Sequence, residues 1–163
     1  MHTVNAILEI AFISFGLFML EIHGRWKIKV TDKVLMQWFA DSWNEEAIIA
    51  YVKEFKAAAA PLMGSDWAII SIFEQWELGI PEIEQHVVEH CEWFKAQGCI
   101  KDCHVYRPSS VKEMQLEKMI PHTEQGYERA VFDNLNDAIN WLDSEGFSLN
   151  QDQFLYDIIK SET

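Results

Sequence analysis

Polar and apolar residues alternate over residues 25–30, and this period of two predicts a strand with one buried face. Residues 33–39 continue after a short turn and are typical of the return strand of a hairpin. Ser42 and Glu45 have the spacing of a capping box, which predicts the start of a helix. Apolar residues then recur at helical spacing as far as Ala59. The first part of the regular pattern is therefore a hairpin followed by a helix.

Downstream, short apolar runs alternate with helical patterns at intervals of about 30 residues, the length of a strand–helix–strand unit. Further strands are predicted over residues 67–73, 103–107 and 128–133. Helices are predicted to begin near Pro81, Ser109, and either Asn134 or Asn136, and a short helix is predicted over 150–160. This order predicts an α/β fold: a mixed sheet of about five strands that begins with a hairpin and carries helices packed on it.

An apolar N-terminal extension, residues 1–19, precedes a single domain that we assign to residues 20–163. Residues 10–20 carry no charge, but about 20 apolar residues are needed to cross a bilayer. No Lys or Arg precedes the run, as a secretion signal would require. We therefore expect an element packed on the domain or completing a dimer. An upstream extension before a start at Met19 is the alternative, and weak membrane attachment is a more remote one.

The net charge and the cysteine content indicate which binding partners and which cellular compartment to expect. The 163 residues include 26 acidic and 13 basic ones, which gives a net charge of -13 and a pI near 4.7. Such a field repels phosphate backbones and anionic lipid, so no nucleic-acid partner is expected. Three cysteines without a repeating spacing predict free thiols and a cytoplasmic location. The chain has no Gly-rich phosphate-binding motif and no G-x-S-x-G, so neither a nucleotide cofactor nor hydrolase chemistry of that type is predicted.

One metal-binding pattern occurs, His86, Glu89 and His90 in the order H-x-x-E-H. On a helix the two imidazoles would share a face, where neutral His side chains can ligate zinc and Glu89 can act as a general base. A zinc hydrolase would need a third ligand that the spacing does not identify. The simpler interpretation is that His86 faces solvent and His90 borders the apolar stripe. We predict neither metal nor cofactor.

Two tryptophans are predicted to lie in loops just after strands, where α/β sheets usually bind ligands. They are Trp43 and Trp76, and with Glu77 and Leu78 they would form an apolar, acid-rimmed pocket or partner patch. The alternative is that these rings only cover the edge of the sheet. The four residues are the predicted ligand- or partner-binding set.

The order of elements over residues 20–146 resembles the STAS or SpoIIAA-like fold of anti-sigma factor antagonists and related lipid- or partner-binding modules. The sequence at residues 20–26, 79–82 and 108–110 also resembles that of small uncharacterised bacterial proteins with this fold. Family members that act as switches carry a phosphorylatable Ser after the central strand. The corresponding residues here, 73–81, contain no Ser or Thr, so the resemblance implies binding without that switch.

The sequence therefore predicts a non-catalytic cytoplasmic module that acts through association with a protein partner or with itself as a homodimer. A binding protein for a small apolar ligand or lipid, held between sheet and helices, is the alternative. A zinc hydrolase using His86, Glu89 and His90 is the more remote one.

Overall fold

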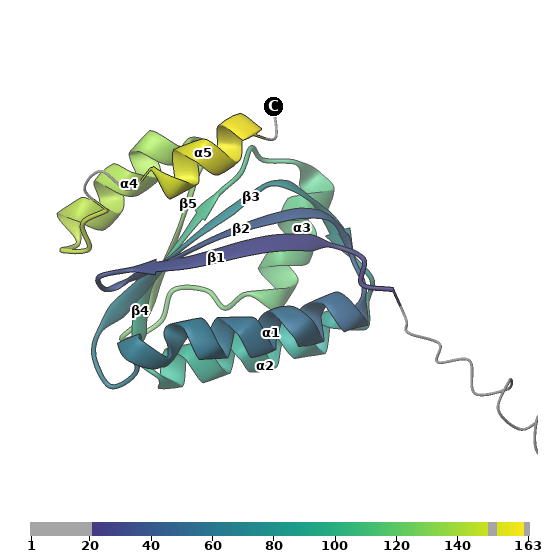
Figure 1. Ribbon diagram of the computed structural model, residues 1–163, viewed down its shortest axis with the longest axis horizontal. Coiled ribbons are helices and arrows are strands. Elements are labelled where there is room, and N and C mark those ends of the chain that lie inside the picture. The colour runs from purple at the N-terminus through teal and green to yellow at the C-terminus, as the bar shows by residue number, and fades with distance from the viewer. Residues whose placement is uncertain (1–20, 150–152, 162–163) are drawn as a thin grey trace, which may run out of the picture.

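The computed structural model describes residues 21–149 and 153–161. The predicted N-terminal extension lies outside this part of the chain. The described residues contain one five-stranded sheet in the order β1-β2-β3-β4-β5 (Figure 1). Its strands are β1 (Arg25–Thr31), β2 (Val34–Trp43), β3 (Trp67–Gly79), β4 (Cys99–Val105) and β5 (Glu128–Phe132). β1 is antiparallel to β2, and the other neighbours are parallel. The mixed five-stranded α/β fold predicted from the sequence is confirmed.

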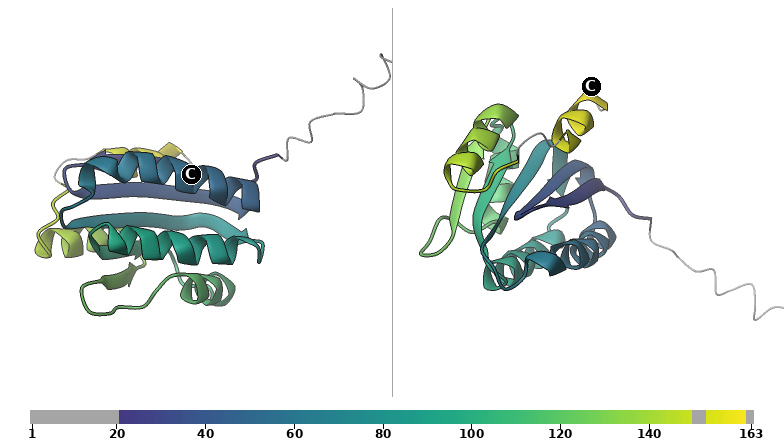
Figure 2. Two further views of the ribbon diagram at one scale, coloured as in Figure 1. Left: turned by 90° about the horizontal axis from the view of Figure 1, so that it is seen from below. Right: turned by 60° about the vertical axis from the view of Figure 1, so that its left-hand side comes forward.

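Helices cover both faces of the sheet and divide its apolar residues into two cores (Figures 1 and 2). The first face carries α1 (Glu45–Ala59), the short 3-10 helix η1 (Ala60–Leu62), α2 (Ile83–Ala96) and α3 (Ser110–Met119). The second carries α4 (Leu135–Ser144) and α5 (Phe154–Ser161). Because both faces are covered, the central strands are almost continuously apolar. In the described part of the chain, no helix is long and apolar enough to cross a membrane.

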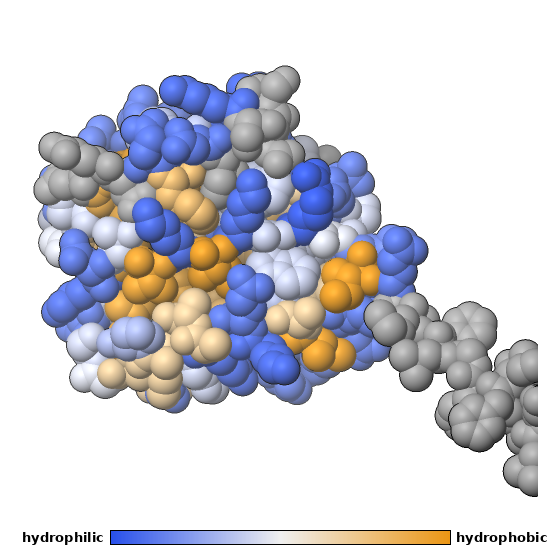
Figure 3. All heavy atoms as spheres, viewed as in Figure 1, coloured by the Kyte–Doolittle hydropathy of each residue, from blue (hydrophilic) through white to orange (hydrophobic). Residues whose placement is uncertain are grey.

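The first core reaches the surface along the β1 edge. Trp26, Ile28 and Val30 pack against this core and are only partly buried. Figure 3 shows apolar side chains gathered between β1 and α1 on this face. Lys27 and Lys29 alternate with them and point to the other face of the strand. Charged side chains of this kind protect an exposed edge strand from pairing with another chain.

The helix starts depend on two asparagines. The Oδ1 atom of Asn44 accepts the backbone N–H of Ala47 at 3.1 Å, so Asn44 caps α1. The predicted capping box at Ser42 is wrong, because β2 runs on through Ser42 to Trp43. Asn134 caps α4 by accepting the N–H of Asp137 at 2.9 Å, which settles the choice between the two predicted caps.

β3 is longer than predicted, and this changes the position of its last residues. The predicted strand ends at Phe73, whereas β3 continues to Gly79. Trp38 of β2 pairs with Ile72, but Ala40 pairs with Gln75, so β3 carries one extra residue between these pairs. Such a bulge shifts the alternation of faces. As a result Phe73 and Trp76 both enter the first core.

Side chains of α3 bind the part of β3 that extends beyond β4. Lys112 donates to the carbonyl oxygens of Phe73 and Glu74 at 2.9 Å each. The amide of Gln115 accepts the N–H of Gly79 at 3.0 Å and donates to its carbonyl at 2.8 Å. The Gln115 side chain thus takes the place of a neighbouring strand and satisfies both backbone groups.

Gly98 ends α2 in a conformation that other residues resist. Its φ is +102°, and an added Cβ would meet the carbonyl oxygen of Ser65. Gly64 also has a positive φ of +84°, but nothing lies within 4 Å of an added Cβ there. A substituted residue would therefore experience the same kind of backbone strain at both positions, but it would clash with a neighbour only at position 98.

We expect Gly98→Ala to lower the free energy of unfolding by about 3 kcal/mol, because it combines a left-handed backbone with a backbone clash. The matched control Gly64→Ala should cost about 1 kcal/mol, since only the first of these effects applies. Urea denaturation of both variants measures the difference. Equal losses in the two variants would show that the Ser65 contact does not constrain this turn.

Candidate functional site

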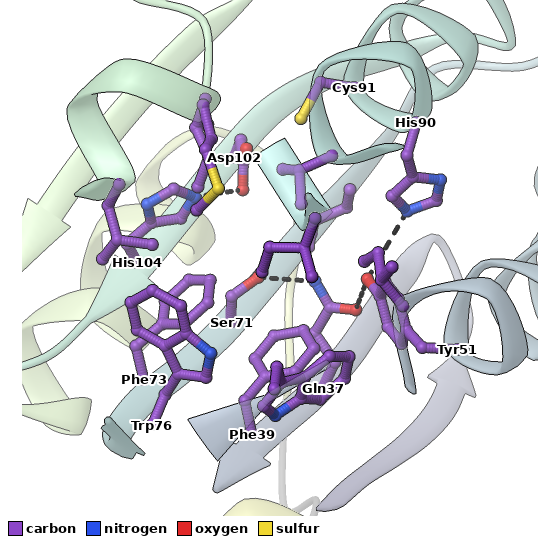
Figure 4. Close-up of a pocket in the computed structure, with 18 of the residues that line it drawn as sticks. Gln37, Phe39, Tyr51, Ser71, Phe73, Trp76, His90, Cys91, Asp102 and His104 are labelled. Atoms are coloured by element: carbon purple, nitrogen blue, oxygen red, sulfur yellow. Dashed lines mark hydrogen bonds and ion pairs between the residues drawn. The ribbon is translucent and has the colours of Figure 1, made fainter. Parts of the chain in front are cut away.

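The first core contains a cavity of about 60 Å³ between the sheet and helices α1, α2 and α3 (Figure 4). Most of its wall is aliphatic or aromatic. Six polar side chains also line it, namely Gln37, Tyr51, Ser71, His90, Asp102 and His104. Five of these are among the buried polar residues of the protein, and Tyr51 is buried as well. A polar group in a dry core must be paired or it destabilises the fold, so this cluster is the strongest candidate for a site.

Three of the polar side chains form a row across the sheet. Gln37 on β2 is in register with Ser71 on β3, and Ser71 is in register with His104 on β4. Side chains at matching positions of neighbouring strands point to the same face. The row therefore crosses the floor of the cavity perpendicular to the strands.

Hydrogen bonds connect this row to both helices that cover it. The Tyr51 hydroxyl on α1 donates to Gln37 Oε1 at 2.7 Å, and Gln37 Nε2 donates to Ser71 Oγ at 2.7 Å. The Tyr51 oxygen lies 3.4 Å from His90 Nε2 on α2. Because Tyr51 already donates to Gln37, its oxygen accepts from a protonated His90 Nε2, as the network assigns it.

Asp102 lies next to the row, on β4 two residues before His104 and on the same face of the sheet, and it is buried. Its Oδ1 lies 3.0 Å from His104 Nε2, and its Oδ2 accepts the Tyr127 hydroxyl at 2.6 Å. Burial alone would raise the pKa of this carboxyl, but the electrostatic interaction with His104 and the hydrogen bonds from His104 and Tyr127 together outweigh it and lower the pKa. Asp102 is therefore ionised, and His104 donates to it through Nε2.

Both imidazoles keep one nitrogen without a partner. Among the described residues, no hydrogen-bonding group meets the Nδ1 atoms of His90 and His104, and both atoms are buried. Burial, helped by the charge of Lys56, lowers the pKa of His90 from 6.5 to about 3, so its ring is neutral at pH 7. With its proton on Nε2, the neutral His90 ring has an unused lone pair at Nδ1.

The residues predicted as a contact patch divide between the interior and the surface. Trp43 and Trp76 lie in strands, not loops, and only 3% and 4% of their surfaces are exposed. Both rings line the cavity from the end where β2 and β3 terminate. Glu77 and Leu78 face outward, and Glu77 accepts the Ser42 hydroxyl at 2.7 Å. The structure brings the two tryptophans together with the polar row, which the sequence did not indicate.

The predicted metal pattern lies on α2, but its histidines face different surroundings. His86 Nε2 lies 2.8 Å from Glu45 Oε1 near the surface, whereas His90 points into the core toward Tyr51. Glu89 is exposed and accepts a hydrogen bond from Gln85 at 2.9 Å. Within residues 21–149 and 153–161, no group of three or more His, Cys, Asp or Glu side chains is placed to hold a metal ion.

Sequence reasoning missed Gln37, Ser71, Asp102 and His104 as site residues. Each lies inside a strand of the sheet, among apolar neighbours. A polar residue at a core-facing position of a buried strand was the available signal, because such positions are normally apolar. The strand predicted to begin at Cys103 begins at Cys99, so Asp102 lay outside the predicted element.

The fold has a known counterpart. The chain has the SpoIIAA-like fold, because both its order of elements and its similarity to a solved structure indicate that fold. An uncharacterised protein of the DUF3478 family with a SpoIIAA-like fold, from Shewanella loihica PV-4, superposes with a TM-score of 0.56 at 11% sequence identity. The match covers 75% of this chain and 96% of that one. No family model matches the sequence, and no curated protein matches it.

The lowered pKa of His90 predicts a loss of stability in mild acid. Between pH 6.5 and about 3 the unfolded chain binds a proton at this residue that the folded chain does not. Lowering the pH from 7 to 5 should therefore remove about 2 kcal/mol of unfolding free energy through His90 alone. His90→Gln should remove most of this pH dependence, while the control His86→Gln should keep it. Denaturant titrations at pH 5, 6 and 7 measure it, and an unchanged slope in His90→Gln would contradict the assignment.

Proposed function

We propose that this protein is a non-catalytic cytoplasmic binding module that holds a small, mainly apolar molecule between its sheet and helices α1, α2 and α3. The observation that carries the proposal is a cavity with aromatic walls whose two buried imidazoles each keep a nitrogen that no described residue pairs with. Apolar walls with a few convergent polar groups are the usual composition of ligand sites. The polar groups would orient the ligand, and the aromatic walls would supply most of the affinity.

The chemistry of the thiols favours binding over catalysis. All three cysteines are buried and unpaired. Burial raises the pKa of the Cys91 thiol, which lines the cavity, and also that of Cys99 and Cys103. A thiol in this state is protonated and a poor nucleophile. Their reduced state also suits the reducing cytoplasm.

A short alcohol tests whether the cavity accepts a guest. We expect butan-1-ol to shift the indole N–H resonances of Trp43 and Trp76 in a saturable way, because both rings line the cavity. Two-dimensional ¹H–¹⁵N NMR of the intact chain measures these shifts. Cys91→Leu, which adds volume at the cavity wall, should abolish them.

Val88→Leu is the matched control, because Val88 lies on the same helix but is exposed and does not line the cavity. It should bind butan-1-ol as the unaltered protein does. Thermal unfolding of both variants identifies any variant that fails to fold. Shifts that rise linearly without saturation, or that persist in a folded Cys91→Leu, would overturn the proposal.

A second candidate function is self-association, and one surface feature favours it. Ile22, Leu78 and Ile80 are exposed by 50%, 37% and 42% around the corner between β2 and α1. The N–H of Ile80 donates to the carbonyl of Trp43 at 3.0 Å, and the N–H of Asn44 donates to the carbonyl of His23 at 3.2 Å. These bonds place Ile80 and the residue after Ile22 beside the end of β2, and Leu78 lies two residues before Ile80. A second copy of the chain could cover the three aliphatic side chains.

If that corner is a dimer interface, replacing Leu78 and Ile80 together by Glu should convert a dimer into a monomer, because two charges would be buried against the partner copy. Sedimentation equilibrium of the full chain measures the mass. Val131→Glu is the control, because Val131 is 41% exposed on β5, at the opposite edge of the sheet. A monomeric unaltered protein, or a double variant that remains dimeric, would exclude this interface.

A further inference from the structure

A groove on the surface between α1 and α2 adjoins the cavity. Its volume is about 210 Å³, and the residues that line it are Ile49, Val52, Lys56, His86, Glu89 and His90. His90 is the one residue common to the lining of the groove and the lining of the cavity. The two spaces are therefore neighbours that meet at this imidazole.

The His90 ring is held as a partition by aromatic contacts on several sides. It meets the Phe55 ring edge-to-face at a centroid distance of 4.3 Å and the Phe94 ring at 5.4 Å. Trp93 stacks on it at 6.4 Å with the rings nearly parallel. Among the described residues, its one polar contact is with the Tyr51 hydroxyl at 3.4 Å. One long hydrogen bond and ring packing therefore hold the His90 side chain in the position that separates the cavity from the groove.

We infer that the cavity and the groove are two parts of one site separated by the His90 side chain, and that the site takes an uncharged amphiphile with a hydroxyl head in the cavity and an aliphatic chain in the groove. The inference rests on the proposed function, since it assumes that the cavity binds a guest. It adds the path of entry and the chemical class of the ligand.

The polar row defines the head group. His104 donates through Nε2 to Asp102, and where this is the only ring proton, its buried Nδ1 is an acceptor that requires a donor. Ser71 Oγ already accepts from Gln37, which leaves the Ser71 hydroxyl proton available to the guest. Ser71 and His104 are register neighbours on adjacent strands. A hydroxyl group can accept from Ser71 and donate to His104 at once, and an ether or thioether cannot.

Charge disfavours an anionic head. The buried carboxylate of Asp102 lines the cavity and would repel a carboxylate head in a medium of low dielectric constant. A neutral hydroxyl avoids this repulsion.

Size assigns the rest of the ligand to the groove. A cavity of about 150 Å³ binds benzene, whereas this cavity has about 60 Å³. It therefore accommodates a hydroxyl group and a few carbons. A longer chain has to leave past His90 along Ile49 and Val52, which are exposed and half-buried aliphatic residues of α1.

Matched ligands test the class. Octan-1-ol should bind at least tenfold more tightly than butan-1-ol, because the four added methylenes lie in the groove. It should also bind at least tenfold more tightly than octanoate and than 1-methoxyheptane, an ether with the same number of heavy atoms. Dissociation constants come from titrations of the intact chain followed by tryptophan fluorescence. Equal affinity for the alcohol and the ether would overturn the assignment of the head group.

A groove variant separates this inference from the proposed function. Ile49→Gln should weaken octan-1-ol about fivefold and leave butan-1-ol unchanged. The control Val111→Gln alters a side chain of similar exposure that lines neither space and should change neither affinity. Butan-1-ol binding without any gain on chain extension would refute the inference and keep the proposed function. No binding of either alcohol would refute both.

His90→Ala tests the partition itself. Removing the ring should speed exchange of octan-1-ol at least tenfold, in both association and dissociation, as NMR line shapes report. Phe55 and Phe94 remain to hold the core, and the melting temperature shows whether the variant is folded. Unchanged exchange rates in a folded variant would place the entrance elsewhere and overturn this part of the inference.

Discussion

The structure depends on the need to pair polar groups that the fold places in a dry interior. Gln37 donates to Ser71 at 2.7 Å across β2 and β3, and the same amide accepts from Tyr51 on α1. Asp102 accepts from Tyr127 and His104. A shift of any one strand by one residue would turn its polar side chain to the other face and leave its partners unpaired. The apolar surfaces drive the layers together, but this network selects one register and one placement of α1 against the sheet.

Such a buried polar network is not expected to stabilise the fold more than an apolar core would. Apolar residues of similar volume can replace buried polar and ionic groups with little loss of stability, and sometimes with a gain. The polar row also borders unfilled space instead of tight packing, which forgoes dispersion contacts at the cavity wall. Two buried imidazole nitrogens that find no partner within residues 21–149 and 153–161 add a further cost in stability. Features that weaken a core in this way are expected where function requires them, and this is the physical reason to look for function inside the first core.

The sequence predicted the architecture well, because local patterns carry it. Alternation over residues 25–30 and the apolar run at 67–73 identified strands, and Asn134 identified a helix start. Prediction failed where distant residues decide. β3 was predicted to end at Phe73, where its apolar run stops. It continues to Gly79 because β2 pairs with it on one side and Lys112 and Gln115 bind its backbone on the other. The site was missed for the same reason. Gln37, Ser71 and His104 are far apart in the sequence, and only sheet register aligns them.

The course of β3 also bears on how the module works. In the resembling switch proteins a phosphorylatable Ser follows the central strand, in a turn at the start of a helix. Here residues 74–79 continue the strand, Trp76 is in the core, and the Gln115 amide binds both backbone groups of Gly79. At this position a kinase would find a strand whose free edge is bound by α3 and whose residues carry no hydroxyl group. Phosphorylation of a hydroxyl within residues 73–81 therefore has no acceptor group. Among the described residues that line the cavity, Ser71, His90 and His104 have hydrogen-bonding capacity that the protein does not use. Within the part of the chain that the structure describes, the polar groups best placed to meet a guest therefore lie at the cavity in the interior.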